Sequence, residues 1–212
     1  MKPWIVALTG ASGVQYGVRL VQKLTEENRR VILLISEPAR LVIREELGIQ
    51  PASFMRAEDL EVIFGPSIRG CLDLYSPRDF TAAVASGSYP TEGMVIVPCS
   101  MGTLGAIAAG LSQNLIHRAA DCVLKEGRRL VIVPRETPLS AIHLENMLKL
   151  ARLGVRVVPA MPGFYSGAQT LGETVDFMVG KIMDQMEVPH ALYPRWTGPV
   201  GTTLKHEAGE SR

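Results

Sequence analysis

Arg135 and Glu136 are the residues of this sequence best placed to do chemistry. They directly follow the apolar, β-branched run 130–133, which is typical of a strand buried on both faces of a parallel sheet. The Thr137-Pro138 pair behind them predicts the start of a helix, with proline at its first position. The two side chains are therefore expected between a strand's carboxyl end and a helix N-terminus, where open α/β sheets bind ligands. An arginine there suits a phosphate group, and the alternative is that the two side chains only pair with each other on the surface.

Three further strand ends carry small, hydroxyl or glycine residues. Strands are predicted at 4–9, 31–35 and 94–98, and each stops where small or polar residues begin. A glycine turn between a strand and a helix presents backbone N–H groups to a ligand. The first turn alone is weak evidence, since it is neither a GxGxxG motif nor a P-loop, and a ligand-free turn is the alternative. The residues concerned are Gly10, Ala11, Ser12, Gly13, Ser36, Cys99, Ser100, Met101, Gly102 and Thr103.

Charged residues share one face of a predicted helix near the middle of the chain. Arg118, Asp121 and Lys125 are spaced i, i+3 and i+7, which predicts either a solvated salt-bridge face or a basic edge presented to a neighbouring subunit. Neither His117 nor His143 has a partner at metal-ligand spacing, so we interpret both histidines as structural.

Three other segments are candidates for contacts with a ligand or with a second subunit. Residues 76–93 form a long loop, in which the small residues 85–88 would cover a flat ligand, or else lie in an ordinary surface excursion or an oligomer contact. The small-residue helix predicted at 104–111 lets another backbone come close, which fits helix packing or a subunit interface. The last helix, predicted at 174–186, carries the cation Lys181.

The whole chain limits the classes of protein to consider. It has 212 residues, 47% of them apolar, with a formal net charge of +1, which indicates a globular α/β domain and argues against a general nucleic-acid or membrane binder. The longest apolar runs fall short of the ~18 residues that span a bilayer, and no signal peptide is evident. We expect one domain over residues 1–196 and a polar tail over 197–212.

Cysteine usage argues against a zinc site and against a disulfide framework. Cys71, Cys99 and Cys122 are widely spaced and form no CxxC pair, which fits a reducing, cytoplasmic location. No basic residue adjoins Cys99 in the sequence, so we interpret it as a packed apolar residue rather than a nucleophile.

The motifs GASG, CSMGT and PRE, together with IHLENMLKL, PGFY and the closing PRW, resemble those of the flavin prenyltransferase family, the UbiX-like proteins. The resemblance covers about Ile5 to Trp196, nearly the whole chain. It implies a Rossmann-like, flavodoxin-type α/β fold of three layers with a mainly parallel sheet, and assembly as a homododecamer. It also implies transfer of a dimethylallyl group from dimethylallyl phosphate to N5 and C6 of reduced FMN, without a metal. The product, prenylated FMN, serves UbiD-type decarboxylases.

The resemblance also implies a role for individual residues at the matching positions. The flavin would be bound by Gly10, Ala11, Ser12, Ser36, Ser100, Met101, Gly102, Thr103 and Arg135. The prenyl phosphate would be bound by Tyr165, Lys181, Lys125, Arg118 and Glu136, some of them from another subunit. The residues taking part in the reaction would be Glu136, Ser12, Glu46 and Trp196.

The expected chemistry agrees with these residue types, with one departure from the family pattern. Cationic side chains would stabilise the departing phosphate, aromatic faces would line a dry pocket for the allyl group, and Glu136 or the released phosphate would take a proton. The family pattern that the chain resembles has an arginine where this chain has Lys181. Lysine keeps the charge but lacks the bidentate fork, so the preferred prenyl phosphate is left open.

Two other functions compete with this one. A flavin-dependent decarboxylase of the peptidyl-cysteine or phosphopantothenoylcysteine type shares the expected fold, but such proteins carry an Asn-rich PASANT-like segment where this chain has PCSMGT. A non-enzymatic flavin storage or delivery protein would bind FMN without needing the cluster of Arg135, Glu136 and Lys181.

Overall fold

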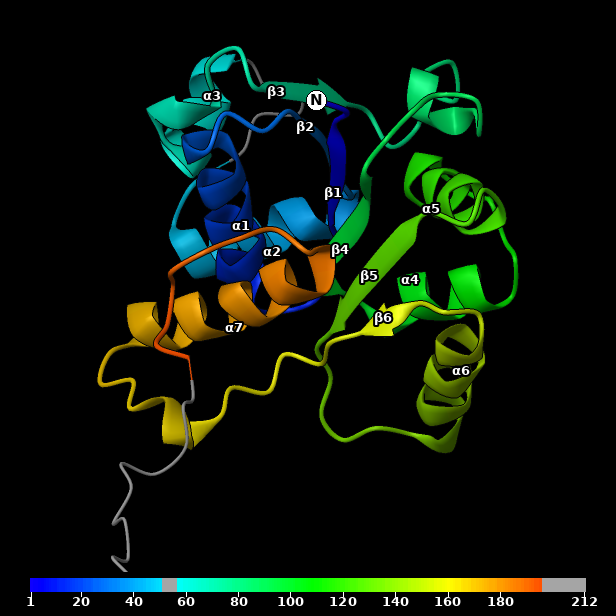
Figure 1. The fold of residues 1–212 in the computed structure, drawn as a ribbon. Helices are drawn as coiled ribbons and strands as arrows, with labels where there is room; N and C mark the ends of the chain where they lie inside the picture. Colours follow the sequence, from blue (N-terminus) through cyan, green and yellow to red (C-terminus); the bar gives the residue numbers. More distant parts are fainter. Residues whose placement is uncertain (51–56, 196–212) are drawn as a thin grey trace, which may run out of the picture.

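Six parallel strands form the centre of the computed structural model, which describes residues 1–50 and 57–195 (Figure 1). The strand order is β3-β2-β1-β4-β5-β6, so the direction of strand addition reverses between β1 and β4. Ligands of open α/β sheets bind outside the carboxyl ends of strands at such a reversal. The strands are β1 (Trp4–Leu8), β2 (Val31–Ile35), β3 (Leu72–Tyr75), β4 (Gly93–Cys99), β5 (Arg129–Pro134) and β6 (Arg156–Val157).

Helices cover both faces of the sheet and give the three layers that the sequence predicts (Figure 1). One core cluster joins the sheet to α1, α2, α3 and α7, and the second joins it to α4, α5 and α6. The helices are α1 (Val14–Glu26), α2 (Glu37–Leu47), α3 (Ala57–Phe64), α4 (Met101–Ala108), α5 (Leu115–Lys125), α6 (Ala141–Arg152) and α7 (Leu171–Met186), with short 3-10 turns η1 (Pro66–Ile68), η2 (Ala83–Ala85) and η3 (Phe164–Ser166).

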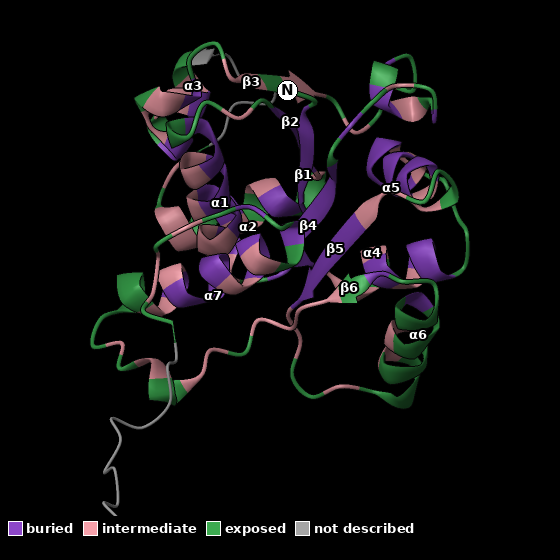
Figure 2. Cartoon of the chain, viewed as in Figure 1, coloured by how far each residue is buried: buried purple, intermediate pink, exposed green. Residues whose placement is uncertain are grey.

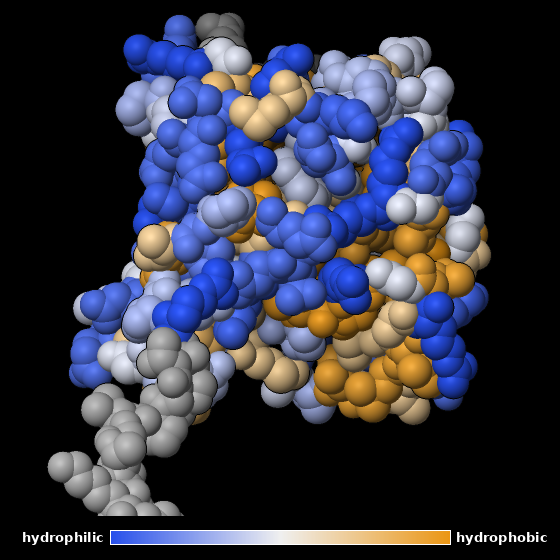
Figure 3. Space-filling view, in the orientation of Figure 1, coloured by the Kyte–Doolittle hydropathy of each residue, from blue (hydrophilic) through white to orange (hydrophobic). Residues whose placement is uncertain are grey.

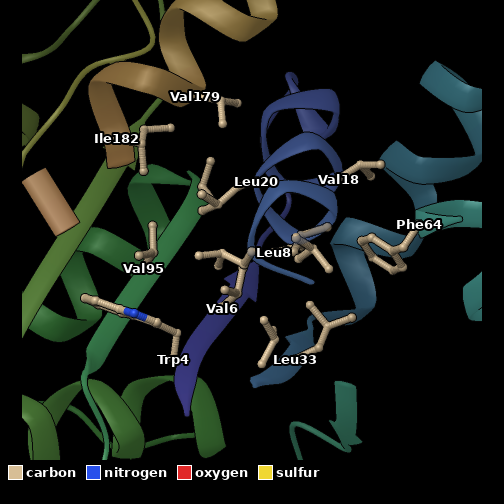
Figure 4. Packing of buried hydrophobic residues seen from close by; sticks show 14 of the residues in the cluster. Trp4, Val6, Leu8, Val18, Leu20, Leu33, Phe64, Val95, Val179 and Ile182 are labelled. Atoms are coloured by element: carbon tan, nitrogen blue, oxygen red, sulfur yellow. The ribbon is translucent and has the colours of Figure 1, made fainter. Parts of the chain in front are cut away.

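The central strands are apolar along their whole length because both of their faces are covered. Every residue of β1, β2 and β4 is buried, as the continuous purple strands of Figure 2 show. Val6 and Leu8 point into the first cluster, where Figure 4 shows them among residues of β2 and β4 and the surrounding helices, while Ile5 and Ala7 point into the second. Burying each such large side chain contributes about 1.5–3 kcal/mol, so the sheet forms a rigid base for its loops.

Helix starts are where the sequence prediction and the structure differ most. The helix predicted at Thr137-Pro138 begins instead at Ala141, because Ser140 caps it and His143 returns a bond to the backbone of Ser140. Helices α4 and α7 begin earlier than predicted: α4 at residue 101 rather than 104, and α7 at residue 171 rather than 174. In each case a Ser or Thr side chain occupies the cap position, and that local bond decides the boundary.

The loop 76–93 does not fold over the GASG turn of its own chain. The carbonyl of Ala85 accepts a bond from Arg118 Nε at 2.9 Å, and the carbonyls of Gly87 and Tyr89 accept bonds from Arg128. These contacts hold the loop against α5 and beside the amino end of β5, whereas the GASG turn follows the carboxyl end of β1 (Figure 1). The expectation that residues 85–88 cover a ligand is therefore wrong for a ligand bound at this chain's own turn.

None of the helices among residues 1–50 and 57–195 has the length and apolar character needed to cross a membrane. The predicted tail over 197–212 lies outside the described residues, as does Trp196.

Candidate functional site

The loops after β1 and β4 meet at the strand-order reversal and are joined there by Thr9. The buried hydroxyl of Thr9 donates to the carbonyl of Pro98 at 2.8 Å and accepts the backbone N–H of Ser100 at 2.7 Å. The backbone N–H of Thr9 also donates to Pro98. One side chain thus fixes the GASG turn relative to the CSMGT turn. The sequence alone does not reveal this role, because Thr9 looks like the last residue of an apolar strand.

Further backbone bonds connect the neighbouring strand ends to this pair. The N–H of Ser36 donates to the carbonyl of Leu8 at 3.0 Å, which ties the end of β2 to the end of β1. The N–H of Arg135 donates to the carbonyl of Cys99 at 3.4 Å, which ties the end of β5 to the end of β4. All four strand-end motifs predicted to bind the flavin therefore lie along one edge of the sheet, in a fixed register.

Two helix N-termini open on this edge, each capped by a serine. Ser36 accepts the N–H of Ala39 at the start of α2, and Ser100 accepts the N–H of Thr103 at the start of α4. The hydroxyl of Ser100 also donates to that of Thr103 at 3.1 Å, so the Thr103 hydroxyl hydrogen is left for another acceptor. Helix N-termini favour anions, and hydroxyl donors beside them suit a phosphate or a flavin oxygen.

Glycine is required in the first turn because α2 packs directly against it. A Cβ atom on Gly10 would lie 2.4 Å from the Cβ of Pro38, which is closer than any real contact. A Cβ on Gly102 would meet nothing within 4 Å, so the start of α4 borders open space. The first glycine therefore serves the packing of the turn, and the second leaves room beside the α4 N-terminus.

Glu46 occupies the N-terminus of α1, where the sequence predicted that backbone donors face a ligand. Its carboxylate accepts the N–H of Gly13 at 2.9 and 3.0 Å and the N–H of Val14 at 3.0 Å. Burial, and next the Glu46 charge, raises the pKa of the neighbouring Tyr16. Ser12, Gly13, Tyr16 and Glu46 line a cavity of about 340 Å³ that α7 closes on its other side. The donors of α1 thus position a carboxylate at the cavity wall.

Arg135 has an unused donor at the same edge of the sheet. Its Nε–H is buried and has no acceptor among residues 1–50 and 57–195. The alternative, a surface pair between Arg135 and Glu136, does not form in the described part of the chain, where the Glu136 carboxylate accepts the backbone N–H of Thr137 at 3.0 Å. A buried N–H group without an acceptor costs free energy unless a ligand supplies one. This donor, together with the serine-capped helices and the space beside Gly102, fits a phosphorylated flavin.

A second cavity, of about 470 Å³, contains Tyr165 and Lys181. It lies between α7 and the segment 157–165, which the sheet holds by a 3.0 Å bond from the N–H of Ala160 to the carbonyl of Pro134. The Lys181 ammonium lies 5.5 Å from the centre of the Phe177 ring and forms no salt bridge to an acidic side chain of the described part of the chain. A cation without an acidic partner is suited to bind an anion, and one wall of its cavity is joined to the end of β5 by the bond between Ala160 and Pro134.

Arg118 and Lys125, the other two cations predicted to bind the phosphate, lie on α5. Lys125 ends α5 and pairs with Glu126 at 3.4 Å, shortly before β5 begins at Arg129. Arg135 follows the opposite end of β5, and six residues of strand span roughly 20 Å. Arg118 bonds Asp121 at 2.9 Å, so one pair of the predicted salt-bridge face forms within the chain, while the basic edge presented to a neighbouring subunit stays a prediction. One chain therefore does not bring these two cations to Tyr165 and Lys181.

The remaining candidates for reactive groups are structural. Complete burial raises the pKa of the Cys99 thiol to about 12, so no thiolate forms there near neutral pH. Burial also lowers the pKa of His117, and His143 serves the cap of α6. No group of three or more potential metal ligands occurs within residues 1–50 and 57–195.

Comparisons with known proteins agree on one family. The Flavoprotein family model matches residues 1–183. A flavin prenyltransferase UbiX from Halalkalibacterium halodurans is 51% identical over 193 residues, which is 91% of this chain and 92% of that protein. The crystal structure of a dodecameric FMN-dependent UbiX-like decarboxylase from Escherichia coli O157:H7 superposes with a TM-score of 0.81 at 43% identity, covering 92% of this chain and all of the other. AnUbiX in complex with FMN and dimethylallyl pyrophosphate gives a TM-score of 0.81 at 36% identity, covering 93% and 98%.

Proposed function

The chain belongs to the UbiX-like flavin prenyltransferases of the Flavoprotein family, and we propose that it transfers a dimethylallyl group from dimethylallyl phosphate to N5 and C6 of reduced FMN. The observation that carries the proposal is the pairing of two anion-binding features at one sheet edge. Arg135 has a buried, unused donor beside the serine-capped helices, and Lys181 is a cation without an acidic partner in the adjoining cavity. A protein that only stored flavin would need the first feature alone.

The flavin side of the proposed site is made by the strand ends. Gly10, Ala11, Ser12, Ser36, Arg135 and residues 100–103 would hold FMN, because they line the edge where the α2 and α4 N-termini open. Reduced FMN, when bound, supplies the nucleophilic atoms that accept the prenyl group. The chain's own contribution is to orient these atoms toward Tyr165 and Lys181 and to exclude water from the allylic carbon.

The phosphate side of the proposed site stabilises charge and takes up a proton. Arg135 and Lys181 would stabilise the negative charge that grows on the phosphate as its bond to the allylic carbon breaks. Tyr165 would donate a hydrogen bond to the same group. The Glu136 carboxylate would accept the proton that leaves C6 of the flavin. Glu46 and Ser12 line the neighbouring cavity, and Trp196, outside the described residues, belongs to the same proposed set.

Arg118 and Lys125 would reach a phosphate site only from another subunit, which connects the function to assembly. Helix α6 and the residue that follows it expose apolar side chains to an extent unusual for a single chain, visible as the orange area over α6 in Figure 3. These are Ile142 (68% exposed), Leu144 (52%) and Leu148 (51%) on α6, and Leu153 (63%) directly after it. We propose that this apolar surface packs against other copies of the chain, in a homododecamer like that of the E. coli relative.

The proposed cellular setting follows from the product. Prenylated FMN would pass to a UbiD-type decarboxylase, which uses it as a cofactor. We place the reaction in the cytoplasm, because Cys71, Cys99 and Cys122 are all free thiols. The cysteine-decarboxylase alternative is not favoured, since the chain has PCSMGT at the start of α4 in place of the Asn-rich segment of those enzymes.

Mass spectrometry of the flavin tests the proposal directly. The purified chain is incubated with dithionite-reduced FMN and dimethylallyl phosphate, and the flavin should gain the mass of one dimethylallyl group. Arg135→Ala should weaken both ligands by about tenfold to a hundredfold, since a hydrogen bond to a charged group contributes about 1.5–3 kcal/mol.

Glu136→Gln separates binding from reaction in the same assay. It keeps the shape of the side chain and should preserve flavin binding, while product formation falls by about a hundredfold or more. Equal product from the wild type, Arg135→Ala and Glu136→Gln would refute the assigned residues. Flavin binding without any product from the wild type would favour a storage protein.

A further inference from the structure

The C-terminal segment 188–195 folds back over α7 and lies against the face that carries Lys181. Glu187, with a φ of 57°, reverses the chain at the end of α7, and the N–H of Val188 then bonds the carbonyl of Met183 at 3.0 Å. Val188 is buried, and the His190 side chain has no exposed surface. The segment is therefore packed along the helix rather than extended into solvent.

Asp184 is the residue that fixes this segment. Its carboxylate accepts the hydroxyl of Tyr193 at 2.5 Å and forms an ion pair with Arg195 at 2.7 Å. The N–H of Leu192 bonds His190 Nδ1, so His190 Nε2 carries its hydrogen and donates to Asp184 at 3.1 Å. Three side chains of the returning segment therefore converge on one carboxylate.

Gly180 lets the Tyr193 ring lie directly on the helix. A Cβ atom on Gly180 would lie 2.4 Å from the ring of Tyr193 and 2.7 Å from that of His190. The ring packs at 5.1 Å from Phe177, one turn before Lys181. The Lys181 ammonium lies 5.1 Å from the centre of the Tyr193 ring and 5.5 Å from that of Phe177. Two aromatic faces thus hold the end of a flexible lysine side chain.

We propose that Tyr193 and Asp184 are positioning residues for Lys181, with Asp184 anchoring the Tyr193 ring and the ring holding the ammonium at the mouth of the Tyr165 cavity. The proposal rests on the proposed function, in which Lys181 binds the prenyl phosphate. Lysine has no planar fork to fix its direction, so a lysine at this position needs such support more than an arginine would. An aromatic face attracts an ammonium group and still leaves its N–H groups free to bind a phosphate.

The first test measures steady-state kinetics with dimethylallyl phosphate. Tyr193→Leu should raise the KM for this substrate by about three- to tenfold, with FMN affinity unchanged, because a cation–π contact is worth about one decade or less. Tyr193→Phe keeps the ring but removes the hydroxyl that bonds Asp184, so its KM should lie between those of the wild type and Tyr193→Leu. Asp184→Asn weakens the same anchor and should behave like Tyr193→Phe. Tyr75→Leu, on β3 at the far edge of the sheet, is the matched control and should leave KM unchanged.

A double-mutant cycle separates positioning from a structural role. If Tyr193 acts through Lys181, Tyr193→Leu should have no further effect on KM once Lys181→Met has been made. An equal rise in KM in both backgrounds would overturn the proposal, as would a loss of FMN affinity in Tyr193→Leu as large as the change in KM.

A spectroscopic measurement keeps the proposal testable if the chain forms no prenylated product. The rings of Phe177 and Tyr193 should shift the NMR signals of the Lys181 ε-methylene protons upfield, and Tyr193→Leu should remove most of that shift. An unshifted Lys181 signal in the wild type would overturn the positioning role. A shifted signal without any product would instead refute the proposed function and leave the contact established.

Discussion

The two halves of the candidate site differ in how completely one chain builds them. On the flavin side, Thr9 and backbone bonds from Ser36 and Arg135 connect four strand ends into one rigid edge. On the phosphate side, Tyr165 is 73% exposed, Lys181 is held by the Phe177 and Tyr193 side chains without an acidic partner in the described part of the chain, and Arg118 and Lys125 belong to α5 rather than to α7.

The difference follows from where each half lies in the fold. The residues proposed for the flavin half all lie within four positions of the end of a buried strand, so the sheet limits where they can be. The phosphate half is made by a loop, by one face of α7 and, we propose, by a neighbouring subunit. Rigid binding of the flavin combined with assembly-dependent binding of the prenyl phosphate would restrict the reaction to the assembled protein.

Preventing assembly should have the largest effect on product formation, and it should impair the phosphate half of the site more than the flavin half. Leu148→Asp places a charge in the exposed apolar surface of α6 and should prevent assembly, because an unpaired charge is costly in an apolar interface. Product formation should fall by about a hundredfold or more as the cations Arg118 and Lys125 are lost from the phosphate half. FMN affinity should change much less.

Light scattering, flavin titration and product assay on the same samples check this expectation. Val62→Asp is the matched control, since Val62 is 68% exposed on α3, on the opposite side of the sheet from α6. A dissociated Leu148→Asp protein that keeps full activity would show that one chain completes the phosphate half by itself.

Removing the hydrogen bonds by which Thr9 joins the loops after β1 and β4 should weaken the flavin half of the candidate site. Thr9→Val keeps the side-chain volume but removes the bonds to Pro98 and Ser100, leaving a buried carbonyl and a buried N–H with poorer partners. Stability should fall by about 1–3 kcal/mol, and FMN affinity by about tenfold, as the two turns lose their fixed register. Urea unfolding and flavin titration measure the two effects. A drop in stability with unchanged FMN affinity would mean that the tie supports the fold but not the site.

How far the sequence predicts the site also depends on the half considered. The strands and the GASG, Ser36 and CSMGT turns follow from apolar runs ended by glycine or serine, and the structure has them where the sequence predicts them. Helix starts were displaced where a cap such as Ser140 or Thr170 overrode the apolar pattern. These errors moved boundaries by a few residues without changing the topology.

Contacts between distant segments escaped the sequence analysis. Glu46 caps α1 from 33 residues away, and Tyr193 reaches Lys181 only because the chain reverses after α7. A hint in the sequence is Gly180 in the interior of the last helix, since a glycine there often has a packing reason. No periodicity identifies which group approaches, so the aromatic support of Lys181 could be found only from the structure.

The smallest predicted effect concerns Asp184, which anchors Tyr193 beside Lys181, and it appears only at acidic pH. Burial acts to raise the pKa of Asp184, but hydrogen bonds from Arg195, Tyr193 and His190 outweigh it and lower the pKa to about 2, from an ordinary value of 3.8. Because the folded-state pKa is the lower one, Asp184 stabilises the fold fully above pH ~4, and this contribution is lost as the pH falls toward ~2.

Comparison of the wild type with Asp184→Asn isolates this contribution, since the other titrating groups are common to both proteins. The free energy of unfolding of the wild type should exceed that of the variant at pH 5, and the excess should shrink by about 1.5 kcal/mol by pH 2.5. Urea titrations at the two pH values measure it. The Asp184 carboxylate holds the pKa of Arg195 above its ordinary value, so Arg195 stays charged and the change reports the loss of the carboxylate. A constant difference would mean that Asp184 is not ionised in its contacts, and the returning segment would then be held by the packing of Tyr193 on Gly180 rather than by the charge of Asp184.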